Sequence, residues 1–202
     1  MAAAPDDAAR AQRDVASGAP RELGWARTRR LVLAEFTADD EAALVAMHRD
    51  PRMRTHLIDD YPLDDPALVR TFIERIGPFY RRNEGLGIWR ASLLEPQPRF
   101  AGWFNLMPIR HWPGEIELGS RLLPATWGSG IAQEGGGLVL DHAFDRIGVS
   151  RVWGVCHPGN RSAQGALAAL GFEPVGVEPY DGVPAAHFQI KANVWRELRD
   201  LS

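Results

Sequence analysis

The chain has 202 residues, which is enough for one domain or for one domain with a tail. Its 45% hydrophobic and 24% charged residues are typical of a soluble globular protein, and its net charge of −3 gives no electrostatic case for binding nucleic acid. No apolar run approaches the roughly 20 residues of a membrane span. The single cysteine, Cys156, excludes an intrachain disulfide and a C-x-x-C metal site, and it fits the cytoplasm, where we expect the protein to act.

The beginning of the chain predicts a tail followed by a strand. Residues 1–26 are rich in Ala, Asp, Arg and Gly, and we expect them to form a flexible extension or to pack on a partner subunit. Residues 27–202 are then a single domain. A basic lead-in runs into three apolar residues at 27–33, which predicts the first strand.

Two helices with a loop between them come next. Thr37 is suited to cap the first helix, which ends at Asp50 because the residue before a proline avoids the helical region. The stretch 52–63 predicts a loop. A second helix begins near Pro66 and continues to about residue 82, with an irregularity at Gly77-Pro78.

The rest of the domain consists of strands and helices that together predict a mixed α/β fold. Short turns join three consecutive strands, which indicates an antiparallel meander, and a strand–helix–strand unit follows them. The predicted strands are 86–94, 100–107, 115–123, 151–155, 172–176 and 185–192, and the predicted helices are 131–144, 161–170 and 195–198.

The stretch 122–134 predicts a strand, a glycine loop and the start of a helix. Pro124 ends the strand because it cannot donate to a sheet ladder, and Gly128 and Gly130 let the chain turn tightly. The unpaired N–H groups and the positive end of the helix dipole favour a phosphate, and a tight turn without a ligand is the alternative. The loop fits neither common nucleotide motif, since Gln133 stands where a dinucleotide fold has its third glycine and no lysine follows Gly130.

This loop resembles the pyrophosphate loop of the GNAT family of acyl-CoA N-acyltransferases, and within that family the RimJ/RimL branch. The pattern of that branch is P-x-x-W-G-x-G-x-A-x-E, and the matching residues here are Pro124, Trp127, Gly128, Gly130, Ala132 and Glu134. Ala125 departs from the Gln or Arg of the family, which removes a side-chain contact but leaves the main-chain cradle. The resemblance extends over residues 28–196, including a T-x-R-L-x-L opening and a segment that begins at Asn160.

The resemblance implies a mixed α/β fold in which helices flank a central, mostly antiparallel twisted sheet. It implies an enzyme that transfers an acetyl or other short acyl group directly from acyl-CoA to a primary amine, with acetyl-CoA as the cosubstrate and without a metal. The acceptor is then a small-molecule or peptide amine, and a homodimer is expected from the family. A non-catalytic acyl-CoA-binding or regulatory module of the same fold is the alternative.

The resemblance also implies the residues that bind the cofactor. The pantetheine arm is expected on the main chain of Leu122 and Leu123 and on the Asn160 amide, which is also suited to cap the helix after it. Trp127 either shields the cofactor or packs in the core. The pyrophosphate is expected on main-chain amides, with the Ser129 hydroxyl as a further donor. These amides belong to Gly128, Ser129, Gly130, Ile131 and Ala132.

Glu117 is the first choice for the base that takes a proton from the amine. It stands where relatives carry E-I/L-G before the loop, but an alternating strand also presents glutamates on its polar surface, and Glu115 has the same facing. Cys156 is a disfavoured nucleophile, because no base is predicted beside it and the family uses direct transfer. Ala163 lacks the hydroxyl that relatives often carry, although Ser162 is beside it, so the general acid stays open.

The loop between the first two helices lines the acceptor side in enzymes of this kind. His56, Asp59 and Asp60 are therefore candidates to contact the amine, and solvated loop residues are the alternative. Tyr180 and His187 are candidate acids, with structural roles as the alternative. The sequence leaves the acceptor and the acyl length open.

Overall fold

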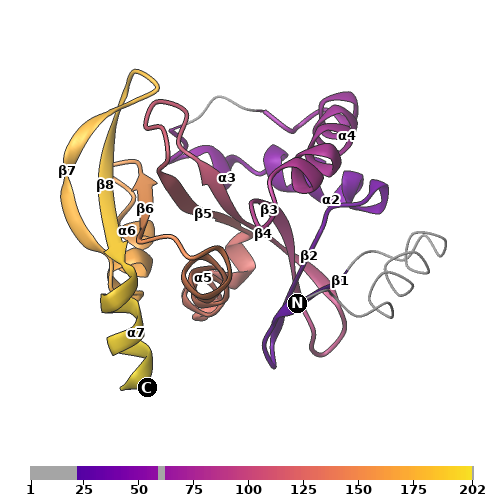
Figure 1. Cartoon of the computed structure of the whole chain (residues 1–202). Helices are drawn as coiled ribbons and strands as arrows, with labels where there is room; N and C mark the ends of the chain where they lie inside the picture. Colours follow the sequence, from indigo (N-terminus) through magenta and orange to yellow (C-terminus); the bar gives the residue numbers. More distant parts are fainter. Residues whose placement is uncertain (1–21, 59–61, 202) are drawn as a thin grey trace.

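A mixed eight-stranded sheet forms the centre of the molecule (Figure 1). The computed structural model describes residues 22–58 and 62–201. The strand order is β1-β2-β3-β4-β5-β6-β8-β7, and neighbouring strands are antiparallel except for β5 and β6, which are parallel. The strands are β1 (Glu22–Arg27), β2 (Leu31–Ala34), β3 (Gly87–Leu93), β4 (Arg99–Pro108), β5 (Ile116–Leu122), β6 (Arg151–Cys156), β7 (Glu173–Tyr180) and β8 (Val183–Lys191).

Helices cover both faces of this sheet, with α2 and α4 on one side and α5 on the other (Figure 1). The first face packs around a cluster that includes Phe36, Leu44 and Val69, and the second around a larger cluster that includes Phe104 and Leu118. The helices are α2 (Glu41–Arg49), α3 (Pro51–Arg54), α4 (Pro66–Arg82), α5 (Ile131–Asp141), α6 (Arg161–Ala169) and α7 (Ala192–Asp200), with helical turns η1 (Ala38–Asp40), η2 (Pro124–Thr126) and η3 (His142–Ile147). The predicted fold class is confirmed.

The start of the chain differs from the prediction. Residues 22–26, expected in the flexible extension, belong to β1, which pairs with β2. The predicted single strand 27–33 is instead a turn followed by β2, because Thr28 reverses the chain: its main-chain N–H donates to the Leu31 carbonyl at 2.8 Å, and its hydroxyl accepts from the Leu31 N–H at 2.9 Å. Residues 1–21 lie outside the described residues.

Two helical details differ from the prediction, while the extent of α4 agrees with it. The loop expected at 52–63 begins inside α3, because the Asp50 carboxylate accepts from the Arg52 main-chain N–H at 3.0 Å and caps this short helix. α4 passes through Pro78 without ending. α7 is longer than the predicted 195–198, and Trp195 ties it to α5 through a 2.9 Å hydrogen bond from its Nε1 to Asp141.

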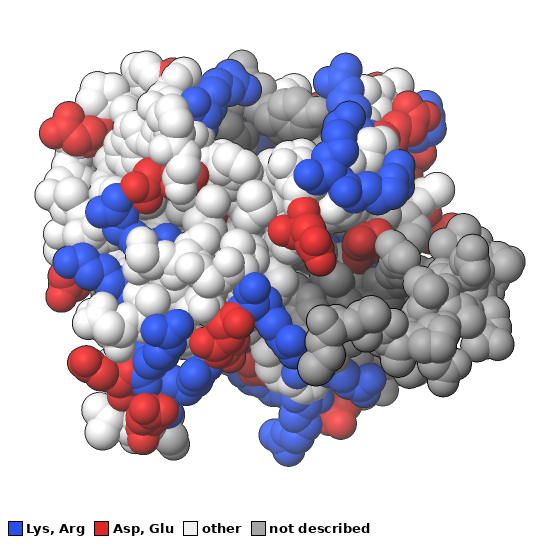
Figure 2. All heavy atoms as spheres, in the orientation of Figure 1, with Lys and Arg blue, Asp and Glu red and all other residues white. Residues whose placement is uncertain are grey.

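The surface carries mixed charge, with basic and acidic side chains interspersed on the face in Figure 2. No helix in the described part of the chain is long and apolar enough to cross a membrane. Within the same residues, no cluster of three or more His, Cys, Asp or Glu side chains is arranged to hold a metal ion.

The strands β5 and β6 meet at one place only. They pair at Glu117 and Trp153, although β5 continues to Leu122 and β6 to Cys156. Beyond this pair the two strands diverge, since no further register joins them. The divergence opens the middle of the sheet at the point where β5 leads into the glycine loop.

Glycines in α5 let the helix approach the sheet. Gly135 lies against the buried ring of Phe104, where an added Cβ atom would be 2.2 Å from Cζ. At Gly136 an added Cβ would be 2.6 Å from a methyl carbon of Leu170. Glycine is unfavourable in a helix interior. At these two positions the lower helix propensity is offset by the close packing of α5 on the sheet and on Leu170.

We expect Gly135→Ala to lower the melting temperature, because the added methyl overpacks Phe104 at about 1–3 kcal/mol. Gly165→Ala in α6 is the control: an added Cβ there has no neighbour within 4 Å, and alanine is favoured over glycine by about 1 kcal/mol in a helix. Thermal unfolding followed by circular dichroism should show opposite shifts. An equal or higher melting temperature for Gly135→Ala would contradict the packing described.

Candidate functional site

A cavity of about 670 Å³ occupies the opening between β5 and β6. On one side of the sheet, helices α5 and α6 border it, with Ala132, Gly136 and Leu167 in its wall. On the other side, the segment 52–58 and the end of β7 border it. We call these the α5 side and the α3 side. The cavity therefore connects the two faces of the sheet.

The glycine loop begins α5 at the edge of this cavity. Gly128 and Gly130 have φ angles of +71° and +81°, in the left-handed region that favours glycine. Gly130 is the N-cap of α5 and supplies no side-chain cap. The main-chain N–H groups of the first turn therefore meet no capping side chain, and the positive end of the helix dipole lies beside them. This geometry fits an anion such as a phosphate.

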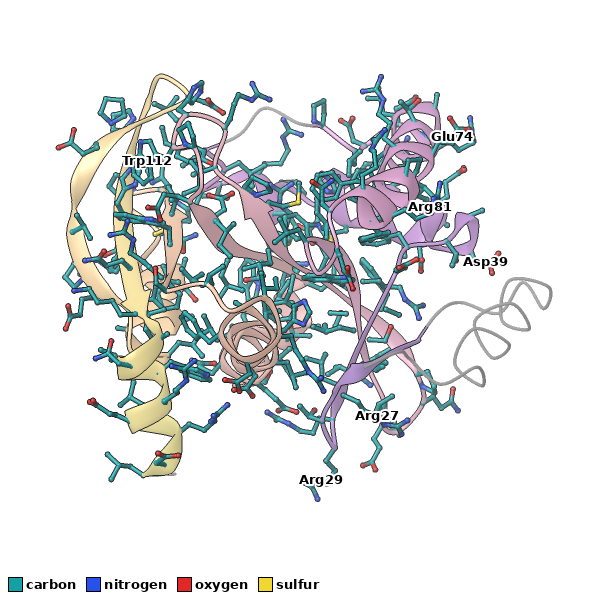
Figure 3. All side chains as sticks on the ribbon, viewed as in Figure 1. Arg27, Arg29, Asp39, Glu74, Arg81 and Trp112 are labelled. Carbon is teal, nitrogen blue, oxygen red and sulfur yellow. The ribbon has the colours of Figure 1, made fainter. Side chains whose placement is uncertain are left out.

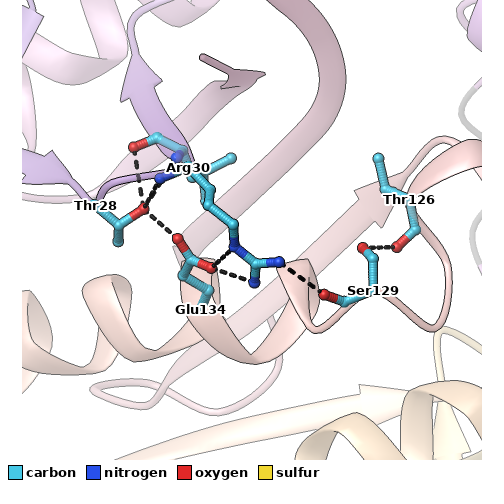
Figure 4. A network of polar contacts seen from close by, with 6 residues as sticks. Thr28, Arg30, Thr126, Ser129 and Glu134 are labelled. Atoms are coloured by element: carbon cyan, nitrogen blue, oxygen red, sulfur yellow. Dashed lines mark hydrogen bonds and ion pairs between the residues drawn. The ribbon is translucent and has the colours of Figure 1, made fainter. Parts of the chain in front are cut away.

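An ion pair joins this loop and the start of α5 to the turn between β1 and β2 (Figure 4). Arg30, in the turn between β1 and β2, forms a salt bridge with Glu134 in the first turn of α5, and its Nε lies 2.7 Å from Oε2. The same guanidinium donates to the Ser129 carbonyl at 3.1 Å, and the Thr28 hydroxyl donates to Glu134. We call Thr28, Arg30, Ser129 and Glu134 the loop clamp. It fixes the loop to the sheet edge.

The clamp changes the acidity of Glu134. Burial by itself would raise the pKa of this carboxyl, but hydrogen bonds from Thr28 and Arg30 and the charge of Arg30 outweigh burial and lower the pKa. Glu134 is therefore ionised at neutral pH, and Arg30 neutralises a negative charge that would otherwise repel an anion at the start of α5.

The two residues predicted to bind the pantetheine arm at the end of β5 differ in which main-chain groups remain free for a ligand. Both main-chain groups of Leu123 are engaged, since its N–H donates to the Ala101 carbonyl at 2.8 Å and its carbonyl accepts from the Thr126 N–H at 2.9 Å. The prediction for Leu123 is therefore wrong. Leu122 lines the cavity, and its carbonyl accepts from the Trp127 Nε1 at 2.8 Å, so only its N–H is left for a ligand.

The other predicted loop residues fall into two groups. Trp127 is 51% exposed and lines the cavity, which excludes the alternative that it packs in the core. The Ile131 side chain is buried, so only its main chain faces the loop. The Ser129 hydroxyl donates to the Thr126 carbonyl at 2.5 Å. Asn160 lines the cavity and caps α6 by accepting from the Ala163 N–H at 3.1 Å, which leaves its NH₂ group for a ligand.

Glu117 and Tyr180 meet on the α3 side of the cavity. The Tyr180 hydroxyl donates to Glu117 Oε2 at 3.0 Å. Burial, followed by the charge of Glu117, raises the pKa of Tyr180, so the phenol stays protonated and remains a donor. Both side chains line the cavity. A carboxylate placed there can take a proton from a bound group.

Glu115, the second candidate base, is engaged away from the cavity. Arg151 forms a salt bridge with it, and Trp153 Nε1 donates to it at 2.7 Å. The hydrogen bond from Arg151 is the main cause that lowers the pKa of Glu115, against the effect of burial. Its carboxylate is therefore held in a structural contact.

A cluster of aromatic rings lies beside Tyr180. Trp112, in the loop between β4 and β5, lies beside β8 (Figure 3) and contacts His187 with ring centroids 5.2 Å apart. His187 is 2% exposed and lies 6.2 Å from the Tyr180 ring. Trp153 contacts Trp112 in an edge-on arrangement, with ring centroids 4.8 Å apart. His187 is buried and is not among the residues that line the cavity, which favours the structural role that was the alternative to an acid.

A family model described as the acetyltransferase (GNAT) domain matches residues 30–173. The chain belongs to the GNAT acetyltransferase family. Enzymes of this family transfer an acyl group from acyl-CoA to an amine. The match covers the clamp residue Arg30, β2 to β6, and the loop at the start of α5.

Relatives of this GNAT chain are distant in sequence. YoaA of Bacillus subtilis, an N-acetyltransferase that is itself uncharacterised, is 25% identical over 155 residues, 74% of this chain and 83% of YoaA. A GCN5-related N-acetyltransferase from Brucella melitensis has a TM-score of 0.68 at 20% identity and covers 86% of this chain and 81% of its own. Mycobacterium smegmatis RimJ, solved with CoA-disulfide, has a TM-score of 0.69 at 16% identity, with coverages of 85% and 88%. These structures show the fold alone.

Two of the remaining candidates of this GNAT domain, Cys156 and His56, line the same cavity. Cys156 lines it but has no hydrogen-bonded base among the described residues. His56 lies on the α3 side, with its ring 5.5 Å from that of His157. Asp59 and Asp60 lie outside the described residues. Sequence reasoning missed Arg30 as a loop contact, although the T-x-R pattern of the opening was the available signal.

We expect Glu134→Gln to be less stable than the native GNAT domain at neutral pH, by an amount that disappears in acid. The folded pKa of Glu134 is lowered, so its contribution is present above the ordinary glutamate pKa of about 4.3 and is lost as pH falls through the folded value. Thermal unfolding of both proteins from pH 7 to pH 3 measures this difference. Glu197→Gln, at an exposed glutamate of α7, is the control and should show no such trend. A difference that stays constant down to pH 3 would refute the ionic role.

We expect Cys156 to be unreactive at neutral pH. Burial raises the pKa of its thiol to about 11, so almost no thiolate is present at pH 7.5. Alkylation by iodoacetamide, followed by mass spectrometry, should be slow at pH 7.5 and should accelerate toward pH 10. Cys156→Ala should keep acetyl transfer within a few-fold. An acyl group trapped on Cys156 during turnover would refute direct transfer.

Proposed function

We propose that the protein is an N-acyltransferase that moves an acetyl or other short acyl group from acyl-CoA directly to a primary amine. One observation carries this proposal: a single cavity joins the uncapped start of α5 to the Glu117–Tyr180 pair across the opening between β5 and β6. The two reactants enter from opposite faces of the sheet and meet between the strands.

The donor takes the α5 side. Its pyrophosphate binds main-chain amides between Gly128 and Ala132, apart from that of Ser129, whose N–H donates to the Thr126 carbonyl at 3.3 Å. The loop clamp reduces the repulsion from Glu134 there. Hydrogen bonds at Ala101–Leu123 and at Ile109–Glu115 direct the odd-numbered residues of β5 toward β4. The N–H groups of Ser120 and Leu122 therefore point into the opening, where they bind the pantetheine arm as a neighbouring strand would. The Asn160 NH₂ group adds a further donor.

The acceptor takes the α3 side. Glu117 removes a proton from the amine, and Tyr180 holds the carboxylate in place through its hydroxyl. The amine nitrogen then bonds to the acyl carbon, the carbon–sulfur bond breaks, and the sulfur leaves as a thiolate that takes up a proton. Holding both reactants in one cavity supplies about 7–11 kcal/mol of the barrier reduction.

Two finer assignments belong to the same proposal. The loop pattern from Pro124 to Glu134 supports a RimJ/RimL-like member of the family. The single, buried Cys156 suits the reducing cytoplasm. Ala125 and Ala163 lack side chains that relatives often carry, and a non-catalytic acyl-CoA-binding module is the outcome that they favour if no transfer occurs.

Melting experiments with acetyl-CoA test donor binding. A ligand that binds only the folded state stabilises it by about 2.7 kcal/mol at a hundredfold excess over Kd. We expect a saturating rise of melting temperature with acetyl-CoA and none with ATP or NAD. No shift at millimolar acetyl-CoA would overturn the cradle and the whole proposal.

We expect Glu117→Gln to keep this acetyl-CoA shift but to lower kcat about a hundredfold or more, since a positioned base contributes about 10²–10⁴. Turnover is measured by release of free CoA thiol with a panel of primary amines. Glu173→Gln, at an exposed glutamate of β7, is the matched control and should retain full activity. Unchanged kcat in Glu117→Gln would exclude the assigned base. Acetyl-CoA binding without turnover of any amine by the native protein would favour the non-catalytic module.

A further inference from the structure

The floor of the α3 side is built from side chains of β4 and β5 that share one face. Trp103 pairs with Arg121, Asn105 with Gly119, and Met107 with Glu117 across these antiparallel strands. Directly paired residues point to the same face of a sheet. Asn105 is therefore on the same face as the proposed base, Glu117.

The Asn105 amide is a polar group without a partner in an apolar strand. The residue is 6% exposed and lines the cavity. Among the residues that the structure describes, none hydrogen-bonds the Asn105 side chain, and its amide is not one of the fully buried polar groups, because it opens to the cavity. Its polar atoms are therefore available to a molecule in the cavity.

Gly119 makes room for this amide. A Cβ atom added at Gly119 would be 2.3 Å from Asn105 Oδ1. The amide thus extends across β5 in the space that a side chain at position 119 would occupy. The Asn105 amide therefore lies between Glu117 and Arg121, which are two residues before and two residues after Gly119 in β5.

We propose that Asn105, placed by Gly119, is a specificity-determining residue that binds a hydrogen-bonding group of the acceptor, such as a carboxamide or hydroxyl, two or three bonds from the reacting amine. The inference rests on the proposed acyl transfer. Asn105 and Glu117 are diagonal neighbours, with Cα atoms about 7–8 Å apart, which leaves space for an amine and a polar group on adjacent carbons. The Asn amide donates and accepts, so it suits either group.

Bisubstrate probes test this without requiring turnover. Two thioethers carry CoA–S–CH₂–CO–NH–R, in which R comes from glycinamide or isobutylamine. The glycinamide and isobutyl probes have the same shape, but only the first has a carboxamide. We expect the native protein to bind the glycinamide probe about tenfold more tightly than the isobutyl probe, as one satisfied hydrogen bond allows. Calorimetry with each probe and with CoA alone gives the affinities.

Variants of two residues separate specificity from structure. Asn105→Leu keeps the side-chain size and should remove the tenfold preference, while the isobutyl probe and CoA bind as before. Gly119→Ala keeps the amide but displaces it, because the new methyl occupies its place, and should reduce the same preference. If Asn105→Leu does not fold, the probe affinities of Gly119→Ala still test the role of Asn105.

Three other outcomes of the binding measurements would overturn either the role of Asn105 or the proposed function. Equal affinities of the native protein for the glycinamide and isobutyl probes would overturn the assignment of Asn105. Equal weakening of both probes and of CoA in the two variants would indicate a structural role and overturn it as well. Failure of the native protein to bind CoA itself would overturn the proposed function, which is a separate result.

Discussion

The site depends on one constraint in the sheet, which is that β5 and β6 pair at Glu117 and Trp153 and nowhere beyond. Had the strands continued to pair, the main-chain groups of β5 after Leu118 would be satisfied by β6, and side chains would fill the middle of the sheet. Their divergence leaves a cavity that reaches both faces. The loop at the start of α5 and the Glu117–Tyr180 pair therefore border one space, although they lie on opposite sides of the sheet.

Glu115 and Glu117 have the same facing in the strand pattern, but the structure gives their carboxylates different partners. Glu115 and Glu117 are two residues apart and face the same way. Arg151 and Trp153 engage Glu115, whereas Glu117 lines the cavity and accepts from a phenol that burial keeps protonated. The Arg151 salt bridge makes Glu115 a weak base. This contact, together with the place of Glu117 in the cavity, is why Glu117 is the proposed base.

The loop clamp shows how distant parts of the chain prepare a binding site. Glu134 stands in the first turn of α5, where a carboxylate is favourable for the helix but repels a bound anion. Arg30, 104 residues earlier, removes this conflict by pairing with the carboxylate, and it fixes the loop through the Ser129 carbonyl. Gly119 plays a comparable part on the other side of the cavity, since its missing side chain admits the Asn105 amide.

The sequence by itself determined the local features of this protein: the antiparallel strands after residue 86, the helix boundaries within a few residues, and the tight glycine loop at Gly128 and Gly130. These follow from the periodicity and conformational preferences of neighbouring residues. It did not reveal that Leu123 is engaged, that residues 22–26 form a strand, or that Asn105 faces the cavity. Only the tertiary structure decided these, because they depend on strand order and on where β5 and β6 separate, which no local pattern encodes.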